Sequence, residues 1–222
     1  MPLRKSHFFT RKLIASLTLA GAVTACAPAV AAAAGCTQLP TSKAFSKFGD
    51  KADYSLAPGG GFEGTNTWTL TGGAKVVSGN ENLGVSSGSK SLFMPITSTA
   101  TSPEFCVDET NPYFRFAMSS THKGGYVAAV LWRNSSGQLT QAEFTSSKYV
   151  TLLSSGWQPS AVSPLAVKLT LGSNDKAATV QLKIISTGNQ NYSDTNLLGT
   201  LASNVFGSVT IDSVMVDPYR RG

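Results

Sequence analysis

Apolar and polar residues alternate with a period of two along several stretches of the chain. Phe114, Phe116 and Met118 fall on one face of such a stretch, and Tyr113 and Arg115 fall on the other. A period of two is typical of β-strands that turn one face towards a core. The same alternation marks residues 126–133, 167–171 and 180–184, which we therefore predict to be strands.

Turn-forming residues separate these stretches. Asn134–Gly137 stands between two of them and predicts a hairpin, and Gly172–Asp175 has the same character. No window of a dozen residues combines an apolar helical stripe with strong helix formers, although a turn of helix is expected within residues 38–53. Short strands at this spacing predict an all-β protein with one domain, a β-sandwich or jelly roll.

The first 34 residues have the three parts of a secretory signal peptide. The apolar segment Leu13–Val23 follows a basic stretch and precedes the small residues Ala29–Ala34. At about eleven residues this segment is too short to span a bilayer. We predict cleavage near Ala34, which gives a signal peptide over residues 1–34 and a secreted domain over residues 35–222. The basic residues of the first stretch are Arg4, Lys5, Arg11 and Lys12.

A second route of export stays open. Val23–Cys26 fits the loose pattern of a bacterial lipoprotein box, and cleavage there would leave Cys26 as a lipid-bearing N-terminus. No later segment is apolar enough for a transmembrane helix. The sequence therefore predicts an extracellular protein without a membrane span, either released or anchored through Cys26.

The signal peptide also carries much of the positive charge. The whole chain has a net charge of +6, with 18 basic and 12 acidic residues. Four basic and no acidic residues lie in the first 34 positions, so the mature chain keeps fourteen basic residues and a net charge of +2. Its charges are sparse and form no basic stripe, which argues against nucleic-acid or membrane-surface binding.

Cysteine usage fits an oxidising compartment. With Cys26 set aside, Cys36 and Cys106 form an even pair, and we predict a disulfide between them, with two reduced thiols as the alternative. A closed loop of about 70 residues is worth roughly 4 kcal/mol in the chain-entropy account of disulfides. These cysteines and His122, the only histidine of the mature chain, show no metal-ligand spacing.

Two short patterns resemble sites of other classes of protein. Gly59–Gly64 fits the dinucleotide pattern G-x-G-x-x-G, but a strand-like stretch follows it where a phosphate-binding helix is needed. Gly84–Gly88 fits G-x-S-x-G, again with a strand where the nucleophile elbow needs a helix. We interpret the first as a turn, the second as a chance match, and the chain as not an enzyme.

Three short motifs occur in an order that resembles the galactose-binding-like jelly rolls, the fold of many carbohydrate-binding modules. They are Gly61–Glu63, Ser87–Leu92 and Val209–Val216, which stand where that family has GxFE, GxxSL and IDDV. The mature chain is also similar to a family of uncharacterised secreted proteins of actinobacteria. The residues that carry this second resemblance are Phe48–Tyr54, Leu56–Gly60, Cys106–Val107 and Asp217–Arg221.

The resemblance implies one structural calcium ion. In modules of this type the early Glu and the late Asp hold calcium together with backbone carbonyls, which corresponds here to Glu63, Asp212 and the backbone near Ser89 and Lys90. The chain departs from the pattern at Ser213, where the family often has a second Asp. The alternative is that both carboxylates accept backbone hydrogen bonds at strand ends.

The resemblance also implies a non-catalytic protein that binds a polysaccharide or cell-wall glycan. Sugars stack on aromatic side chains, and we expect Tyr113, Arg115, Tyr126 and Trp132 to share the one face opposite the core residues. The expected core residues include Val127, Ala129 and Leu131 of one strand. The alternative for Trp68 and Trp157 is burial in the core, and the alternative for Tyr126 and Trp132 is a place under a covering loop. The alternative function is a secreted structural or protein-interaction protein. The candidate ligand-binding residues are Tyr113, Arg115, Tyr126, Trp132 and Trp157, with Gln181 nearby.

Overall fold

Strands make up most of the regular structure in the computed structural model. It describes residues 39–108, 113–121, 124–133, 139–146, 156–165, 177–187 and 207–217. Within these residues every strand pairing is antiparallel. The strands are β1 (Ser55–Leu56), β2 (Thr69–Thr71), β3 (Lys75–Ser78), β4 (Lys90–Met94), β5 (Thr99–Thr101), β6 (Phe105–Asp108), β7 (Tyr113–Ser120), β8 (Gly125–Arg133), β9 (Leu139–Ser146), β10 (Gln158–Pro159), β11 (Ser163–Pro164), β12 (Ala177–Thr187) and β13 (Val209–Asp217).

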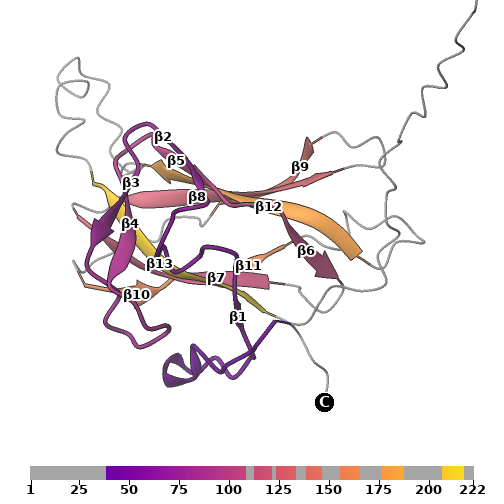
Figure 1. Cartoon of the computed structure of the whole chain (residues 1–222), viewed down its shortest axis with the longest axis horizontal. Helices are drawn as coiled ribbons and strands as arrows, with labels where there is room; N and C mark the ends of the chain where they lie inside the picture. The colour runs from indigo at the N-terminus through magenta and orange to yellow at the C-terminus, as the bar shows by residue number, and fades with distance from the viewer. Residues whose placement is uncertain are drawn as a thin grey trace, which may run out of the picture. The chain divides into compact units, whose positions relative to one another are not determined.

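These strands form two sheets that pack as a sandwich (Figure 1). The seven-stranded sheet has the order β10-β7-β13-β4-β3, with β1 also paired to β13 and β11 to β7. The six-stranded sheet has the order β2-β5-β12-β8-β9, with β6 also paired to β12. The predicted all-β sandwich is confirmed. Because β13 lies between β7 and β4, the last of the described strands completes the centre of its sheet.

One hydrophobic core fills the space between the sheets. Phe114, Phe116 and Met118 of β7 are fully buried there, which confirms the predicted alternation in this strand. Trp68 also belongs to this core, and its indole Nε1 donates a hydrogen bond to the carbonyl of Pro58 at 3.0 Å. Burial of these large side chains supplies most of the driving force for joining the sheets.

The alternation in β8 was assigned to the wrong faces. Tyr126 and Val130 point into the core, and the ring of Tyr126 packs edge-on against Phe116 with centroids 4.8 Å apart. Trp132, two residues further along, packs against the same core. Both faces of β8 are apolar, so its pattern alone does not say which face is inside. Pairing with β12 decides this, because Val130 stands opposite the buried Leu182.

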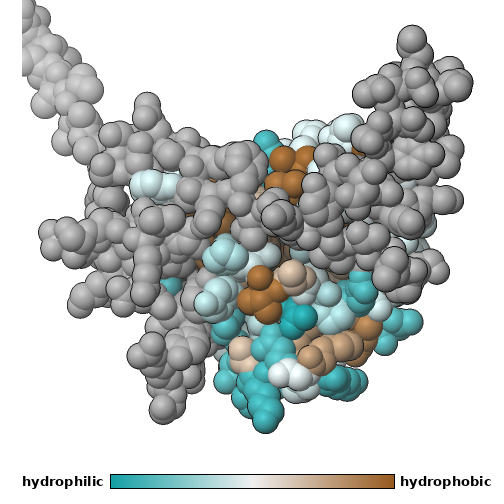
Figure 2. Space-filling model, turned by 180° about the vertical axis from the view of Figure 1, so that it is seen from behind, coloured by the Kyte–Doolittle hydropathy of each residue, from teal (hydrophilic) through white to brown (hydrophobic). Residues whose placement is uncertain are grey.

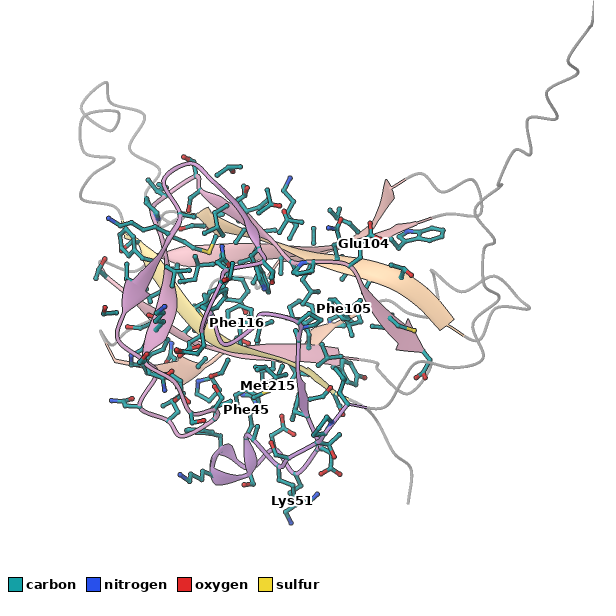
Figure 3. The ribbon with its side chains drawn as sticks, in the orientation of Figure 1. Phe45, Lys51, Glu104, Phe105, Phe116 and Met215 are labelled. Atoms are coloured by element: carbon teal, nitrogen blue, oxygen red, sulfur yellow. The ribbon has the colours of Figure 1, made fainter. Side chains whose placement is uncertain are left out.

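A second, smaller hydrophobic cluster lies on the outer face of the seven-stranded sheet. Its buried members are Phe45, Tyr54, Val85 and Met215. Figure 3 shows Phe45 beside Met215, on the opposite side of this sheet from Phe116. The segment before β1 supplies the first two residues and contains a 3-10 helix, Ser46–Phe48, where a helical turn was expected. The outer face of this sheet is therefore partly covered by a second layer of chain.

Several predictions fall outside the described residues. These include the signal peptide, the lipoprotein box, Cys36, His122 and the strand expected at residues 167–171. Cys106 lies on β6 and is disulfide-bonded, but its pairing with Cys36 stays a prediction. A compact unit spans residues 33–222. Among the described residues, no helix has the length and hydropathy needed to cross a bilayer.

Candidate functional site

The glycine-rich turn at residues 58–61 is shaped by its contact with β13. The main-chain N–H of Val214 donates to the carbonyl of Gly60, and the N–H of Ala57 donates to the carbonyl of Val214, both at 2.9 Å. A Cβ added at Gly60 would lie 2.6 Å from the Val214 carbonyl oxygen. Only glycine allows this backbone approach. The structure thus confirms the interpretation of the glycines as a turn.

The turn meets β13 at a β-bulge. The register with β7 shifts between Asp212 and Met215, and Ser213 in between has a φ of 52°. Phe62, just after the turn, has a φ of 56°. Non-glycine residues seldom adopt this region, and such strain often collects at functional sites. Here Phe62 precedes Glu63, and Ser213 follows Asp212, so each predicted metal-binding carboxylate adjoins a strained residue.

Glu63 accepts hydrogen bonds from the loop that leads into β4. Its Oε1 accepts from the main-chain N–H of Ser89 at 2.6 Å and of Lys90 at 2.7 Å, and its Oε2 accepts from the Ser89 hydroxyl at 3.1 Å. These bonds, that from the Ser89 N–H most of all, hold the pKa of Glu63 below its ordinary value. The motif resemblance predicted that backbone carbonyls near Ser89 and Lys90 bind calcium together with Glu63. In the structure these residues lie beside Glu63 but turn their N–H groups to it, as the alternative of backbone hydrogen bonds expected.

Asp212 is fully buried and close to two other carboxylates. Its Oδ2 accepts from the main-chain N–H of Glu81 at 3.0 Å, and its Oδ1 accepts from the N–H of Ser213 at 2.6 Å. Burial raises the pKa of Asp212 to about 7 in spite of these bonds, and the negative charges of Glu81 and Glu63 add to the rise. A buried acid with this pKa keeps its proton over part of the neutral range.

Glu81 is the acidic residue that the sequence analysis missed. Its carboxylate accepts hydrogen bonds from four main-chain N–H groups of its own loop. The donors are Leu83, Gly84 at 2.9 Å, Val85 at 2.7 Å and Ser86 at 2.9 Å. This loop joins β3 to β4. A single acidic residue within a run of Gly, Ser and Asn was the only available signal, since such a side chain can organise the backbone around it.

Two side-chain oxygens pack closely against Gly88. A Cβ added there would lie 2.6 Å from Glu63 Oε1 and 2.7 Å from Asn80 Oδ1. The Asn80 oxygen is buried and has no hydrogen-bond partner. A carboxylate and an amide oxygen are ligands of the kind that calcium takes. Among the described residues, however, no group of three or more His, Cys, Asp or Glu is arranged to hold a metal ion.

The predicted aromatic binding face does not form as expected. Tyr113 is 42% exposed at the start of β7, whereas Tyr126 is only 2% exposed. Tyr126 and Trp132 belong to the six-stranded sheet and point inwards, so they share no face with Tyr113 and Arg115. The expectation of one common face is wrong for these four residues, because β8 presents its opposite side to the core.

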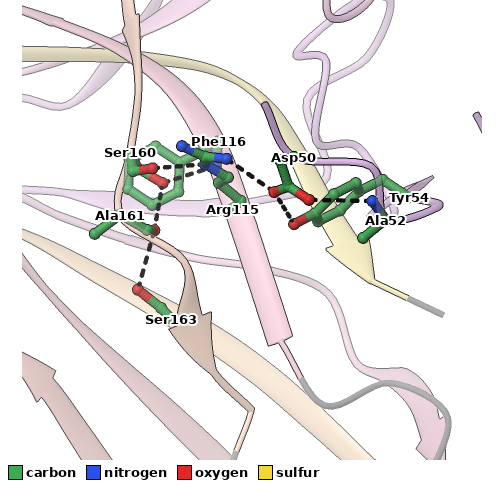
Figure 4. A network of polar contacts seen from close by, with 8 residues as sticks. All are labelled: Asp50, Ala52, Tyr54, Arg115, Phe116, Ser160, Ala161 and Ser163. Atoms are coloured by element: carbon green, nitrogen blue, oxygen red, sulfur yellow. Dashed lines mark hydrogen bonds and ion pairs between the residues drawn. The ribbon is translucent and has the colours of Figure 1, made fainter. Parts of the chain in front are cut away.

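Arg115 is occupied by contacts within the protein (Figure 4). Its Nη1 forms an ion pair with Asp50 at 2.8 Å, and its Nε donates to the carbonyl of Ser160 at 2.6 Å. The guanidinium also lies 4.9 Å from the ring centroid of Phe45. Asp50 in turn accepts from the hydroxyl of Tyr54 at 2.7 Å. Arg115 thus fastens residues 39–54, which we call the covering segment, to β7.

Strand register aligns a row of side chains across another part of the same outer face. Strand register places Lys75 opposite Phe93, Phe93 opposite Thr210, and Thr210 opposite Ser119. Trp157 immediately precedes β10, in which Gln158 pairs with Met118 of β7. The same register sets Trp157 opposite Ser119, so Trp157 continues the row. Lys75 is exposed and the other four are half-buried, while neither aromatic side chain packs against either core cluster. We call these five residues the open row.

Comparison with known proteins gives only distant matches. No protein-family model and no curated protein matches the sequence. The enzymatically active domain of tailspike protein 4 of bacteriophage CBA120 matches with a TM-score of 0.40 and 16% identity, over 73% of this chain and 21% of that one. The chain therefore spans about a fifth of that domain.

Two carbohydrate-binding modules match over nearly their whole length. The family 11 module of Clostridium thermocellum, in complex with a β-1,3-1,4-mixed-linked tetrasaccharide, has a TM-score of 0.37 and 10% identity over 76% of this chain and 98% of the module. TmCBM61, in complex with β-1,4-galactotriose, has a TM-score of 0.34 and 11% identity over 72% and 95%. At these values the likeness is one of distant β-architecture, and no residue role is transferred from it.

Proposed function

We propose that this chain is an exported, non-catalytic domain of the galactose-binding-like jelly-roll type that binds a glycan through the open row. The row itself supports this proposal most directly. Two aromatic side chains outside both core clusters, Phe93 and Trp157, stand on one face with the hydroxyl of Thr210 between them. We take a glycan as the class of ligand because the sequence motifs resemble those of carbohydrate-binding modules.

The chemistry of the open row suits a sugar chain. Aromatic rings offer apolar faces to the C–H side of a pyranose, while hydroxyl and amino groups bind its hydroxyls. Thr210 supplies a hydroxyl between Phe93 and Trp157. Neighbouring strands lie about 4.8 Å apart, so three strand spacings separate the two rings by about 14 Å. That span suits an oligosaccharide segment better than a single sugar.

A panel of polysaccharides and peptidoglycan tests the proposal. A ligand that binds only the folded protein raises the midpoint of thermal unfolding. We expect one class of glycan to raise it, and we expect Phe93→Ala and Trp157→Ala to remove the response. Thr71→Val is the matched control, because Thr71 is an exposed residue of β2 in the other sheet. Unchanged binding in both alanine variants would show that the ligand lies elsewhere.

Absence of catalysis is part of the proposal. Glu63, Glu81 and Asp212 lie near the bulge of β13, and each accepts hydrogen bonds from main-chain N–H groups. Such bonds suit carboxylates that organise loops. Turnover of any bound glycan, detected as new reducing ends, would contradict this part.

We also propose one structural calcium ion, held by Glu63 and Asp212 with the amide oxygen of Asn80. The buried Asn80 oxygen without a hydrogen-bond partner supports it, as does the approach of this oxygen and Glu63 Oε1 to the same glycine, Gly88. The ion would supply positive charge between the β3–β4 loop and β13. We expect calcium to raise the thermal midpoint, chelator to lower it, and Glu63→Gln to remove the difference. No response of the wild-type protein to calcium would refute the site.

Export completes the proposal. We propose cleavage of residues 1–34, with lipid attachment at Cys26 as the alternative, and a disulfide between Cys36 and Cys106. Mass spectrometry of the exported protein tests these forms. The mature N-terminus gives the cleavage site, an added lipid mass would show attachment at Cys26, and a linked peptide would show the disulfide. A mature protein that starts before residue 26 would contradict both routes.

The alternative function is a structural or protein-interaction role without a small ligand. Three of the exposed large hydrophobic residues, Leu39, Phe48 and Leu56, lie in the covering segment or at its end. In Figure 2 the hydrophobic residues of the described part stand among hydrophilic ones, not in one broad patch. This role gains support if no glycan in the panel binds.

A further inference from the structure

We infer that the glycan bound by the open row carries carboxylate or phosphate groups, and that Lys75 is the residue that selects for them. This inference rests on the proposed function and adds the charge class of the ligand. It follows from the position of the Lys75 ammonium group and from the charges around it.

Lys75 places its ammonium group over the first aromatic ring of the row. It is an exposed residue of β3, and strand register sets it opposite Phe93 of β4. Its Nζ lies 6.0 Å from the centroid of the Phe93 ring. Attraction between a cation and the ring face is favourable at this distance and restricts the lysine side chain. A sugar next to Phe93 would therefore have a positive charge near it.

No described acidic residue neutralises this charge. Neither ion pair found among the described residues involves Lys75. On the same face, Asp212 follows Thr210 by two residues, but it is fully buried beneath the β3–β4 loop. Glu63 meets β4 at Lys90, three residues from Phe93, where its carboxylate accepts main-chain hydrogen bonds. The charge over Phe93 is thus available to a ligand anion.

A different explanation for Lys75 is protection of a sheet edge. β3 is the last strand in the order of its sheet, and lysine on an edge strand discourages pairing with other chains. That role needs only an exposed charge and predicts no effect on glycan affinity. The two explanations therefore differ in a measurable way.

The test compares charged and neutral forms of the same polymer. We would measure affinities of the mature protein for polygalacturonate and its methyl ester, and for a phosphomannan and its dephosphorylated form, at low and high salt. An exposed ion pair supplies up to about 1 kcal/mol, so we expect a charged form to bind about two- to fivefold more tightly at low salt. Salt should reduce this preference because it screens exposed charges.

Variants assign the preference to Lys75. We expect Lys75→Gln to remove it while binding of the neutral form persists, and Lys75→Arg to retain it. Lys183→Gln is the control, since Lys183 is a lysine on β12 of the other sheet. Equal affinity for charged and neutral polymers, binding of neutral glycans only, or a preference that survives Lys75→Gln would overturn the inference and leave the proposed function in place. Failure to bind any glycan would overturn both.

Discussion

The main-chain N–H of Glu81 donates a hydrogen bond to Oδ2 of Asp212 across 3.0 Å. This bond joins the loop between β3 and β4 to the bulge in β13. Asp212 binds the loop from the sheet, while the Glu81 side chain binds four N–H groups within the loop. Asp212 and Glu81 thus hold the β3–β4 loop in place on the outer face of the seven-stranded sheet.

The first prediction concerns the pH dependence of stability. Burial raises the pKa of Asp212 from 3.8 to about 7, so between about pH 4 and pH 7 the folded protein holds a proton that the unfolded chain has lost. The free energy of unfolding therefore falls as the pH rises through this window. Asp217, whose pKa burial raises to about 6, acts in the same direction.

Urea unfolding between pH 4 and pH 8, with chelator present, measures this effect. We expect the unfolding free energy of Asp212→Asn to fall less steeply with pH, because the asparagine cannot ionise. The contribution of Asp217 to the fall should remain. The account fails if the difference in unfolding free energy between wild type and Asp212→Asn stays constant across the window.

The second prediction concerns the glycine turn. Gly60→Ala would place a Cβ 2.6 Å from the carbonyl oxygen of Val214, so the backbone must shift. We expect a loss of about 1–3 kcal/mol in the free energy of unfolding, as for other overpacked sites. Gly61→Ala is the control, because its Cβ would lie 3.7 Å from the Leu56 side chain and nothing closer. Equal denaturant midpoints for the two variants would argue against the backbone contact.

The third prediction concerns the covering segment. Arg115→Met removes the ion pair to Asp50 and the bond to the Ser160 carbonyl, and leaves a half-buried carboxylate without its cation. We expect a loss of about 2–3 kcal/mol in the free energy of unfolding. Limited proteolysis should also cleave residues 39–54 faster.

A surface ion pair in the same segment provides the control for Arg115. Lys43 lies 3.5 Å from Asp53, and both side chains are exposed, at 60% and 38%. Lys43→Gln should change the unfolding free energy by less than about 1 kcal/mol. If the two variants lose similar stability, Arg115 does not fasten the segment in the way described.

The fourth prediction concerns the β3–β4 loop. Glu81→Gln replaces an acceptor of four N–H groups by an amide that can accept with one oxygen only. We expect a loss of about 1–3 kcal/mol, because buried donors remain unsatisfied. Asn82→Ala, an exposed neighbour in the same loop, should change stability by less than about 0.5 kcal/mol. Hydrogen exchange of the loop amides would show whether the loss is local.

The sequence predicts some strands well and others poorly, for a physical reason. In β7 the inner residues, such as Phe116, are apolar and an outer residue, Arg115, is charged, so the pattern identifies the core face. In β8 both Tyr126 and Val127 belong to apolar sets, and only the register with β12 shows that Tyr126 is inside. Alternation assigns a face only where the two faces differ in polarity.

The sequence likewise predicts some parts of the candidate sites and not others. Motif order placed Glu63 near Ser89 and Lys90, and these residues are in contact, although through N–H groups and not through the expected carbonyls. The open row has no such signal, because Lys75, Phe93, Ser119 and Thr210 are far apart in the sequence and meet only through strand register. The occupation of Arg115 by Asp50 likewise depends on how the covering segment folds back.

Amide chemical-shift changes of the isotope-labelled mature protein, titrated with the oligosaccharide of the best-binding glycan, test the central proposal most directly. We predict that the largest changes cluster along the open row, at residues 75, 93, 119, 157 and 210. Changes confined to the outer face of the six-stranded sheet, around Thr69, Thr99 and Lys183, would contradict the proposed binding face. No change with any glycan would contradict the proposed function itself.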